Sequence, residues 1–262
     1  MTYCNIIVES DKNTARVTLD RPEHMNPLDG DTIGELMACF RELERDDAMR
    51  IVRITGAGRA FSAGGDLQGY VDLYRKPDEY RICLGDFFDL FDLMERSAMV
   101  FVAEVNGFCV AGGLELMLAC DLAVASEDAR IGDGHLNFGQ LPGAGGSQRL
   151  PRAIGATRAK QLIYTGRLID GREAERIGLV AEAVPSDALA ATVDTLIETM
   201  LEKSPLGLAR AKLLVNEGMR CDLAAALELE IDLVHDYATT SEDAIEGLMA
   251  FKDKRKPKFT GR

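Results

Sequence analysis

The chain is 262 residues long, enough for one large domain with a sizeable core or for a domain with a satellite. Its 43 acidic and 30 basic residues give a net charge of -13, which disfavours binding to nucleic acid or anionic membranes. The six cysteines are scattered without C-x-x-C spacing, so we expect reduced thiols, no metal site and a cytoplasmic location. No apolar run approaches the roughly 20 residues of a membrane span, and a signal-peptide pattern is lacking at the start.

The first half of the chain alternates between strand-like and helix-like segments. A polar turn at 11–13 separates apolar runs at 6–8 and 15–19, which predicts a β-hairpin. Residues 29–45 carry apolar side chains at spacings of three and four, typical of an amphipathic helix. The other expected segments are strands at 51–54, 100–105 and 121–125 and a helix at 77–96. This alternation predicts an α/β fold with short parallel strands.

Beyond about residue 185 the pattern becomes entirely helical. We expect helices at 188–203, 206–217, 223–237 and 241–252. We therefore divide the chain into an α/β core at 1–200 and a C-terminal helical region at 201–262. The end of this region is locally basic, and its cations are Lys252, Lys254, Arg255, Lys256 and Lys258.

Two glycine pairs, Gly64-Gly65 and Gly112-Gly113, are the most informative feature of the sequence. Each follows an apolar strand-like segment, and peptide N–H groups beside glycines can approach a small anion closely. The second pair also opens a predicted helix, whose free N–H groups and dipole favour negative charge, with Glu115 in the first turn. The pattern indicates an oxyanion hole beside a carboxylate. The alternative is that the glycines only form turns and that Glu115 only complements the helix dipole.

Other chemical motifs are incomplete or missing. The run Gly56-Ala57-Gly58 begins like a dinucleotide fingerprint, but Phe61 stands at the third glycine position. There is no G-K-[ST] and no G-x-S-x-G motif. The histidines, which lack metal-ligand spacing, are His24, His135 and His235.

Three segments resemble the signature blocks of the enoyl-CoA hydratase/isomerase (crotonase) superfamily. They are residues 60–67 (AFSAGGDL), 105–116 (VNGFCVAGGLEL) and 141–151 (LPGAGGSQRLP), and the ending 251–257 (FKDKRKP) matches as well. The resemblance implies a spiral of β-β-α repeats with a C-terminal helical trimerisation region, assembled as a homotrimer or homohexamer. It also implies an acyl-CoA thioester as ligand, with no cofactor other than the coenzyme A of the substrate.

The resemblance also implies roles for individual residues. The two peptide N–H groups that hold the thioester oxygen in this family fall on Gly65 and Gly112. Glu115 matches the first of the two catalytic glutamates of the hydratases. The other implied substrate contacts are Ala63, Asp66, Leu67 and Gly113, together with Phe251 and Lys254 from a neighbouring subunit.

The chain departs from the family pattern at the second catalytic glutamate. The segment 131–136 reads IGDGHL and places His135 at that position. A histidine suits acid/base chemistry near neutral pH, and here Asp133 could orient it or Glu115 could pair with it. The alternative is a histidine that only shapes the acyl pocket. Aromatic residues between 70 and 91 could also form the pocket wall or belong to the core, among them Tyr74, Tyr80, Phe87, Phe88 and Phe91.

We therefore expect an acyl-CoA enzyme that acts through a thioester enolate and hydrates a 2-enoyl-CoA or catalyses the reverse dehydration. The altered acid/base pair leaves isomerisation, hydrolysis and decarboxylation as alternatives. A non-catalytic acyl-CoA-binding oligomer is an alternative from another class. The presence of Glu115 and of both glycine donors argues against it.

Overall fold

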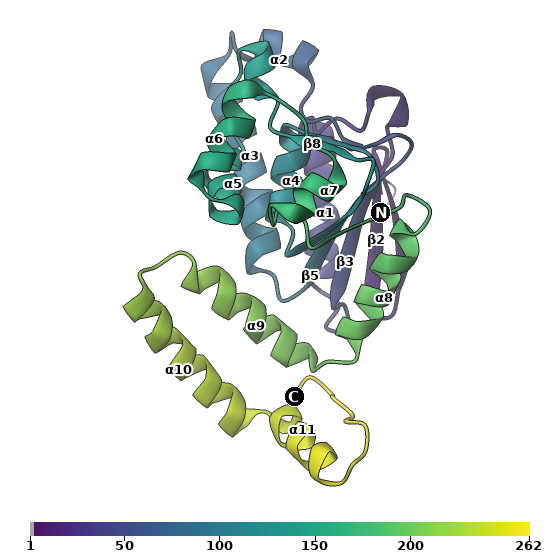
Figure 1. Cartoon of the computed structure of the whole chain (residues 1–262), viewed down its shortest axis with the longest axis vertical. Helices are drawn as coiled ribbons and strands as arrows, with labels where there is room; N and C mark the ends of the chain where they lie inside the picture. The colour runs from purple at the N-terminus through teal and green to yellow at the C-terminus, as the bar shows by residue number, and fades with distance from the viewer. Residues whose placement is uncertain (1–2) are drawn as a thin grey trace.

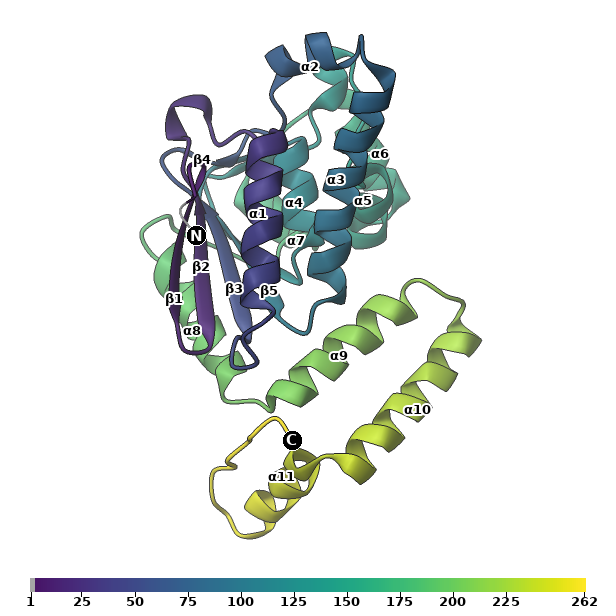
Figure 2. The same ribbon diagram turned by 180° about the vertical axis from the view of Figure 1, so that it is seen from behind.

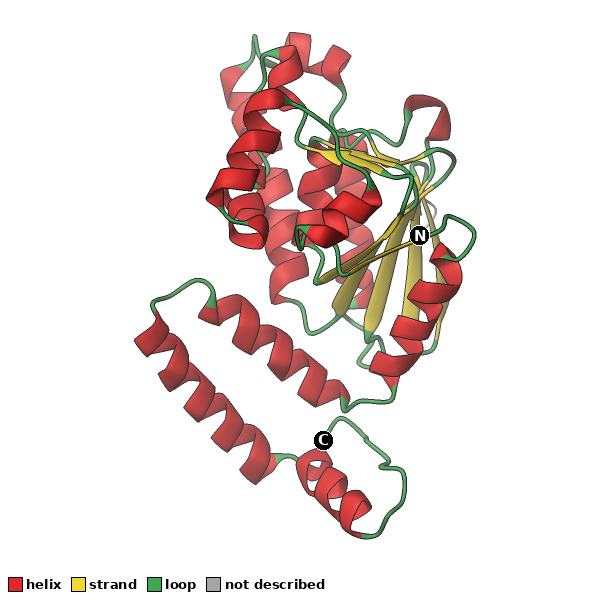
Figure 3. Ribbon diagram, viewed as in Figure 1, coloured by secondary structure: helices red, strands yellow, loops and turns green. Residues whose placement is uncertain are grey.

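A six-stranded sheet lies between helices on both of its faces in the computed structural model, which describes residues 3–262 (Figures 1 and 3). The strand order is β1-β2-β3-β5-β7-β9, and only the β1–β2 hairpin is antiparallel. The strands are β1 (Ile6–Asp11), β2 (Thr14–Leu19), β3 (Ile51–Gly56), β5 (Val100–Val105), β7 (Leu122–Ser126) and β9 (Glu182–Val184). The predicted hairpin and the predicted strands at 51–54, 100–105 and 121–125 are confirmed.

Side-chain alternation divides the central strands between two hydrophobic clusters. In β3, Val52 and Ile54 face the larger cluster with α1 and α3, whereas Ile51 faces the smaller cluster with α8. β5 alternates in the same way, with Phe101 on the first side and Val102 on the second. Because both faces are covered, every residue of these two strands is buried.

A second, three-stranded sheet has the order β4-β6-β8, and all its strands are parallel. These strands are β4 (Ala60–Ser62), β6 (Phe108–Val110) and β8 (Arg130–Gly132). Each follows directly on a strand of the large sheet, so the chain repeats a unit of two strands and a helical segment. The expected spiral of β-β-α repeats is thus confirmed. The sequence did not predict these strands, because three residues are too few to show an alternating pattern.

Helices cover the sheets and form most of the rest of the core. They are η1 (Pro22–His24), α1 (Gly30–Leu43), α2 (Leu67–Leu73), α3 (Pro77–Arg96), α4 (Gly112–Ala119), η2 (His135–Phe138), α5 (Gly146–Ile154), α6 (Ala156–Thr165), α7 (Gly171–Arg176) and α8 (Leu189–Leu201). The Asp29 carboxylate caps α1 by accepting the N–H of Thr32. The predicted helix at 77–96 is confirmed as α3, which Pro77 begins. The aromatic residues between 70 and 91 are therefore divided between α2 with its C-terminal end and α3.

The last helices extend away from the sheets (Figure 2). They are α9 (Pro205–Gly218), α10 (Leu223–Thr240) and α11 (Glu242–Lys252), and α10 packs along α9. No residue of α10 is buried. Apolar side chains that α9, α10 and α11 leave exposed include Val215, Leu227, Ile231, Leu248 and Phe251. Within the described residues, no helix has both the length and the apolar character that a membrane span requires.

Lys212 anchors α9 to the core. Its ammonium group donates to the carbonyl oxygens of Met94 and Met99, both at 2.6 Å, and lies 3.0 Å from Oδ2 of Asp121. The same group lies 5.0 Å from the centre of the Phe101 ring. Burial lowers the pKa of Lys212, and the Asp121 carboxylate opposes that shift.

We expect Lys212→Met to lower the free energy of unfolding by roughly 3–5 kcal/mol, because it leaves the partly buried Asp121 carboxylate without its cation. Denaturant unfolding measures the change. The control is Lys160→Met on the exposed surface of α6. Equal effects of the two substitutions would contradict the anchoring role of Lys212.

Candidate active site

The three strands of the small sheet end at one cavity of about 520 Å³. The carboxyl ends of parallel strands meet at the same edge of a sheet, so segments far apart in the sequence converge there. Gly65 follows β4, Gly112 follows β6 and His135 follows β8. The predicted site residues that line the cavity are Ala63, Gly65, Asp66, Leu67, Gly112, Glu115 and His135.

Three predicted substrate contacts do not line this cavity. Gly113 instead packs against β4, where an added Cβ would lie 2.9 Å from Cβ of Ser62. Phe251 and Lys254 are exposed at α11, at the opposite end of the molecule from α2 (Figures 1 and 2). Within a single chain, these two residues are therefore separated from the cavity.

The backbone at the two glycine segments leaves N–H groups free for a ligand. The N–H groups of Gly65 and Gly112 have no backbone acceptor among residues 3–262. An added Cβ on Gly64 would lie 2.9 Å from the nitrogen of Gly112, so the two segments touch and a side chain there would force them apart. Ala111, which precedes α4, has a φ of 54°, and a positive φ is unusual for a residue with a side chain.

Glu115 lies in the first turn of α4 and is almost completely buried. Its Oε1 accepts the N–H groups of Ala144 and Gly146, at 2.9 and 2.7 Å. Burial raises the pKa of Glu115, although these two hydrogen bonds and the nearby His135 oppose the shift. The other oxygen, Oε2, faces His135. Oε1 therefore holds the side chain in place, while Oε2 is free to contact a ligand.

His135 lies between two carboxylates. Its Nε2 is 3.8 Å from Oε2 of Glu115, and its Nδ1 is 3.1 Å from Oδ2 of Asp133. Burial lowers the pKa of His135, but the interactions with Asp133 and Glu115 outweigh burial and raise it overall. The arrangement therefore provides two titratable groups, Glu115 and His135, facing the same space.

Aromatic side chains from α2 and α3 form one wall of the cavity. Of the aromatic residues expected at the pocket, Tyr74, Tyr80 and Phe87 line it, as does Tyr70. The Tyr74 and Tyr80 rings pack edge to face with centres 4.8 Å apart. Phe88 instead points to solvent, and Phe91 is a core residue.

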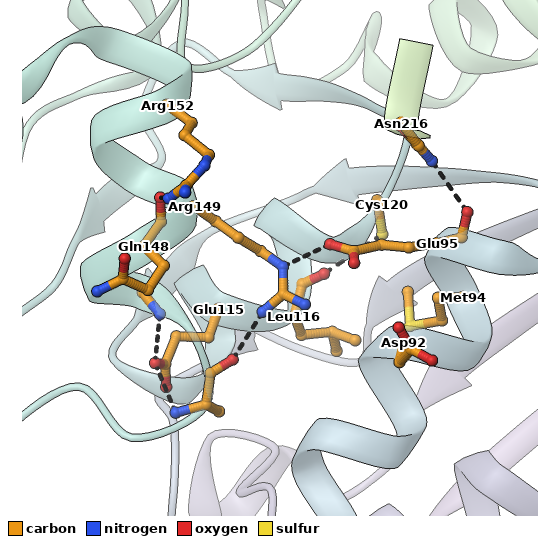
Figure 4. Close-up of polar contacts among 12 residues, drawn as sticks. Asp92, Met94, Glu95, Glu115, Leu116, Cys120, Gln148, Arg149, Arg152 and Asn216 are labelled. Carbon is orange, nitrogen blue, oxygen red and sulfur yellow. Dashed lines mark hydrogen bonds and ion pairs between the residues drawn. The ribbon is translucent and has the colours of Figure 1, made fainter. Parts of the chain in front are cut away.

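Arg149 of α5 supports the loop that holds Glu115, a role that the sequence did not reveal. Its Nη1 donates to the carbonyl oxygen of Ala144 at 3.0 Å, and its Nε donates to Oε1 of Glu95 at 2.5 Å. Figure 4 shows Arg149 between Glu95 and the segment bound to Glu115. Asn216 of α9 donates in turn to the backbone oxygen of Glu95 at 2.9 Å. The support of the site thus reaches the C-terminal helices.

We expect Arg149→Lys to lower kcat by about 10²-fold with little change in KM, because an ammonium group cannot keep both the Ala144 and Glu95 contacts and the loop would shift. Steady-state kinetics measures both constants. Arg152→Lys is the matched control, since Arg152 lies at an exposed position of the same helix and, within residues 3–262, donates to the backbone oxygen of Gln148 one turn earlier rather than to the loop. A normal kcat in the Arg149 variant would contradict this role.

Among residues 3–262, no group of three or more histidine, cysteine, aspartate or glutamate side chains is arranged to hold a metal ion. The groups in the cavity that match the predicted chemistry are the two backbone donors, the buried carboxyl group of Glu115 and the imidazole of His135. Other polar side chains in the lining include Arg21, His24 and Asp66.

Comparison with protein families gives a match over nearly the whole chain. The model of the enoyl-CoA hydratase/isomerase family matches residues 9–262. A probable enoyl-CoA hydratase of Mycobacterium bovis is 38% identical over 262 residues, which is the full length of both chains. The crotonyl-CoA hydratase of Syntrophomonas wolfei is 36% identical, again over the full length of both.

Solved structures show the same architecture. A crystal structure of an enoyl-CoA hydratase from Bacillus anthracis superposes with a TM-score of 0.93 at 34% identity, covering 99% of this chain and 100% of that one. A structure from Geobacillus kaustophilus, also described as an enoyl-CoA hydratase, gives a TM-score of 0.95 at 29% identity, with coverage of 100% and 98%.

Proposed function

The chain belongs to the enoyl-CoA hydratase/isomerase family, and we propose that it hydrates a 2-enoyl-CoA thioester or dehydrates the corresponding 3-hydroxyacyl-CoA. The observation that carries this proposal is the position of Glu115. One of its oxygens is held by backbone amides and the other faces a cavity that also contains the Gly65 and Gly112 donors. No cofactor other than the coenzyme A of the substrate is needed.

The proposed chemistry requires stabilisation of an enolate. When water adds to the β-carbon of the enoyl group, negative charge develops on the thioester oxygen, and a proton must then reach the α-carbon. The N–H groups of Gly65 and Gly112 would bind that oxygen, and each such donor contributes roughly 3–4 kcal/mol to transition-state stabilisation in comparable sites. Glu115 would take the proton from water or return it to carbon.

We further propose that His135 shares the acid/base work with Glu115. Its Nε2 lies 3.8 Å from Oε2 of Glu115, which is too long for a direct hydrogen bond, and a water or substrate atom beside the pair could contact both atoms. The raised pKa of His135 keeps a proton available near neutral pH. An imidazole that only shapes the pocket remains the alternative to test.

A panel of CoA thioesters with mass analysis of the products tests the proposed reaction. Hydration of crotonyl-CoA adds the mass of one water and removes the absorbance of the conjugated double bond. Isomerisation leaves the mass unchanged, hydrolysis releases free coenzyme A, and decarboxylation loses carbon dioxide. Tight binding across the panel without turnover would favour a non-catalytic acyl-CoA-binding protein.

We expect Glu115→Gln to lower kcat by about 10²–10⁴-fold, because it removes the group that transfers the proton. The amide oxygen of glutamine can still accept from Ala144 and Gly146, so the affinity for acyl-CoA should stay within a few-fold of wild type. Turnover and equilibrium binding measure the two effects. Glu175→Gln at an exposed position of α7 is the control, and comparable turnover in both variants would refute the assignment.

We also propose that the chain assembles as a homotrimer or homohexamer through its C-terminal helical region, residues 201–262, with residues 1–200 as the core. The support is the row of exposed apolar side chains on α9, α10 and α11, which would gain from burial against another copy. The scattered, unpaired cysteines support our expectation of a cytoplasmic location.

In such an assembly, Phe251 and Lys254 would reach the coenzyme A bound by a neighbouring subunit. With a net charge of -13, the protein needs local cations to hold the phosphates of coenzyme A. Lys254→Ala should therefore raise KM at low ionic strength and have a smaller effect at high salt. Lys160→Ala serves as the control. An unchanged KM at low salt would exclude this role for Lys254.

A further inference from the structure

Asp133 is completely buried beside the cavity, where an ionised carboxylate is costly unless it has a partner. It follows β8 directly, and Gly134 after it adopts a left-handed conformation with a φ of 66°. That turn folds the next residue back, so that Oδ1 of Asp133 accepts the backbone N–H of His135 at 3.3 Å. The two side chains are thereby placed together.

The second oxygen of Asp133 has one close neighbour. Oδ2 lies 3.1 Å from Nδ1 of His135, and it makes no hydrogen bond to any other group among residues 3–262. Nδ1 likewise has no other partner. The two atoms are close but imperfectly aligned, as is common for catalytic hydrogen bonds before substrate binds.

We propose that Asp133 is a positioning residue that holds the proton of His135 on Nδ1 and directs Nε2 toward the substrate. When His135 is protonated, Asp133 and His135 together form a neutral acid. Glu115 can then remain ionised beside the pair, because the pair carries no net charge. The pair would replace, in charge and in function, a single protonated carboxylic acid opposite Glu115. The expected effects on kcat rest on the proposed function, whereas the expected NMR results do not.

The titratable and charged groups around His135 come from several elements. Asp133 lies before it in the same loop, and Glu115 faces it from α4. The other such residues that line the shared cavity are Arg21, His24, Asp66, Tyr70, Tyr74 and Tyr80. Burial raises the pKa of Tyr70 and of Tyr80, that of Tyr80 to about 12, so these two side chains stay neutral near physiological pH. Helix α6 packs against η2 but contributes no residue to the described lining of the cavity.

Removing the Asp133 charge should therefore lower the pKa of His135, because burial would remain while one of the two interactions that raise it is lost. Asp133→Asn keeps the size of the side chain and can still accept the N–H of His135. We expect the pKa to fall by about 1–3 units. In the pH profile of kcat, the inflection that reports the titration of His135 should move to lower pH by the same amount.

Histidine NMR tests the proposal without any assumption about the substrate. The chain has three histidines, so ring signals are few, and His135→Gln identifies the signal of His135 by its loss. In the wild-type protein, ¹⁵N shifts should show the neutral ring protonated on Nδ1. A ring protonated on Nε2 would overturn the proposal even if no Asp133 variant folds. An unchanged midpoint of His135 titration in a folded Asp133→Asn protein would overturn it as well.

A double-mutant cycle then separates positioning from structure. If Asp133 acts through His135, Asp133→Asn should lower kcat at least about tenfold in the wild-type background and have little further effect in the His135→Gln background. Equal losses in both backgrounds would show a merely structural residue. If the thioester panel finds no turnover, the proposed function fails while the NMR outcome still decides the role of Asp133.

Discussion

The parallel pairing of β4, β6 and β8 is the constraint on which the site depends. These strands contain three residues each, yet their pairing brings Gly65, Gly112 and His135 to one edge. The pairing is close because glycine permits it: side chains at Gly64 or Gly113 would collide with the neighbouring strand segment. The large sheet and its helices hold these short strands in register, since each is the continuation of a strand of the buried sheet.

Glu115 illustrates how the fold keeps a reactive carboxyl group both buried and usable. Burial favours its neutral form and raises its pKa, while the amides of Ala144 and Gly146 favour the charged form and limit that rise. A carboxyl group balanced in this way can both accept and donate a proton. The balance depends on the loop at 143–146, whose position depends on Arg149 and, through Glu95, on α3 and α9.

The sequence predicted those parts of the fold that repeat over many residues. The hairpin, α1, α3 and the C-terminal helices have periodic patterns, and their observed bounds lie close to the predicted ones. The small sheet lacks such a pattern, so its strands were missed although the glycines that follow them were recognised. Motifs identified Gly65, Gly112 and Glu115, which line the cavity. Arg149 was missed because its significance arises from contacts with Ala144 and Glu95, and no local pattern encodes these.

The electrostatics of the site follow from local rather than overall charge. A chain with a net charge of -13 repels an anionic ligand at long range, and the cavity itself contains the buried carboxyl of Glu115. In the proposed reaction, the backbone N–H groups of Gly65 and Gly112 would stabilise the enolate oxygen without adding a titratable cation. The imidazole of His135, flanked by Asp133 and Glu115, would limit the negative charge near the reacting atoms. Backbone N–H groups would bind the enolate oxygen, and a histidine whose charge is balanced by Asp133 would handle the proton. Together these groups make the cavity compatible with enolate chemistry inside an acidic protein.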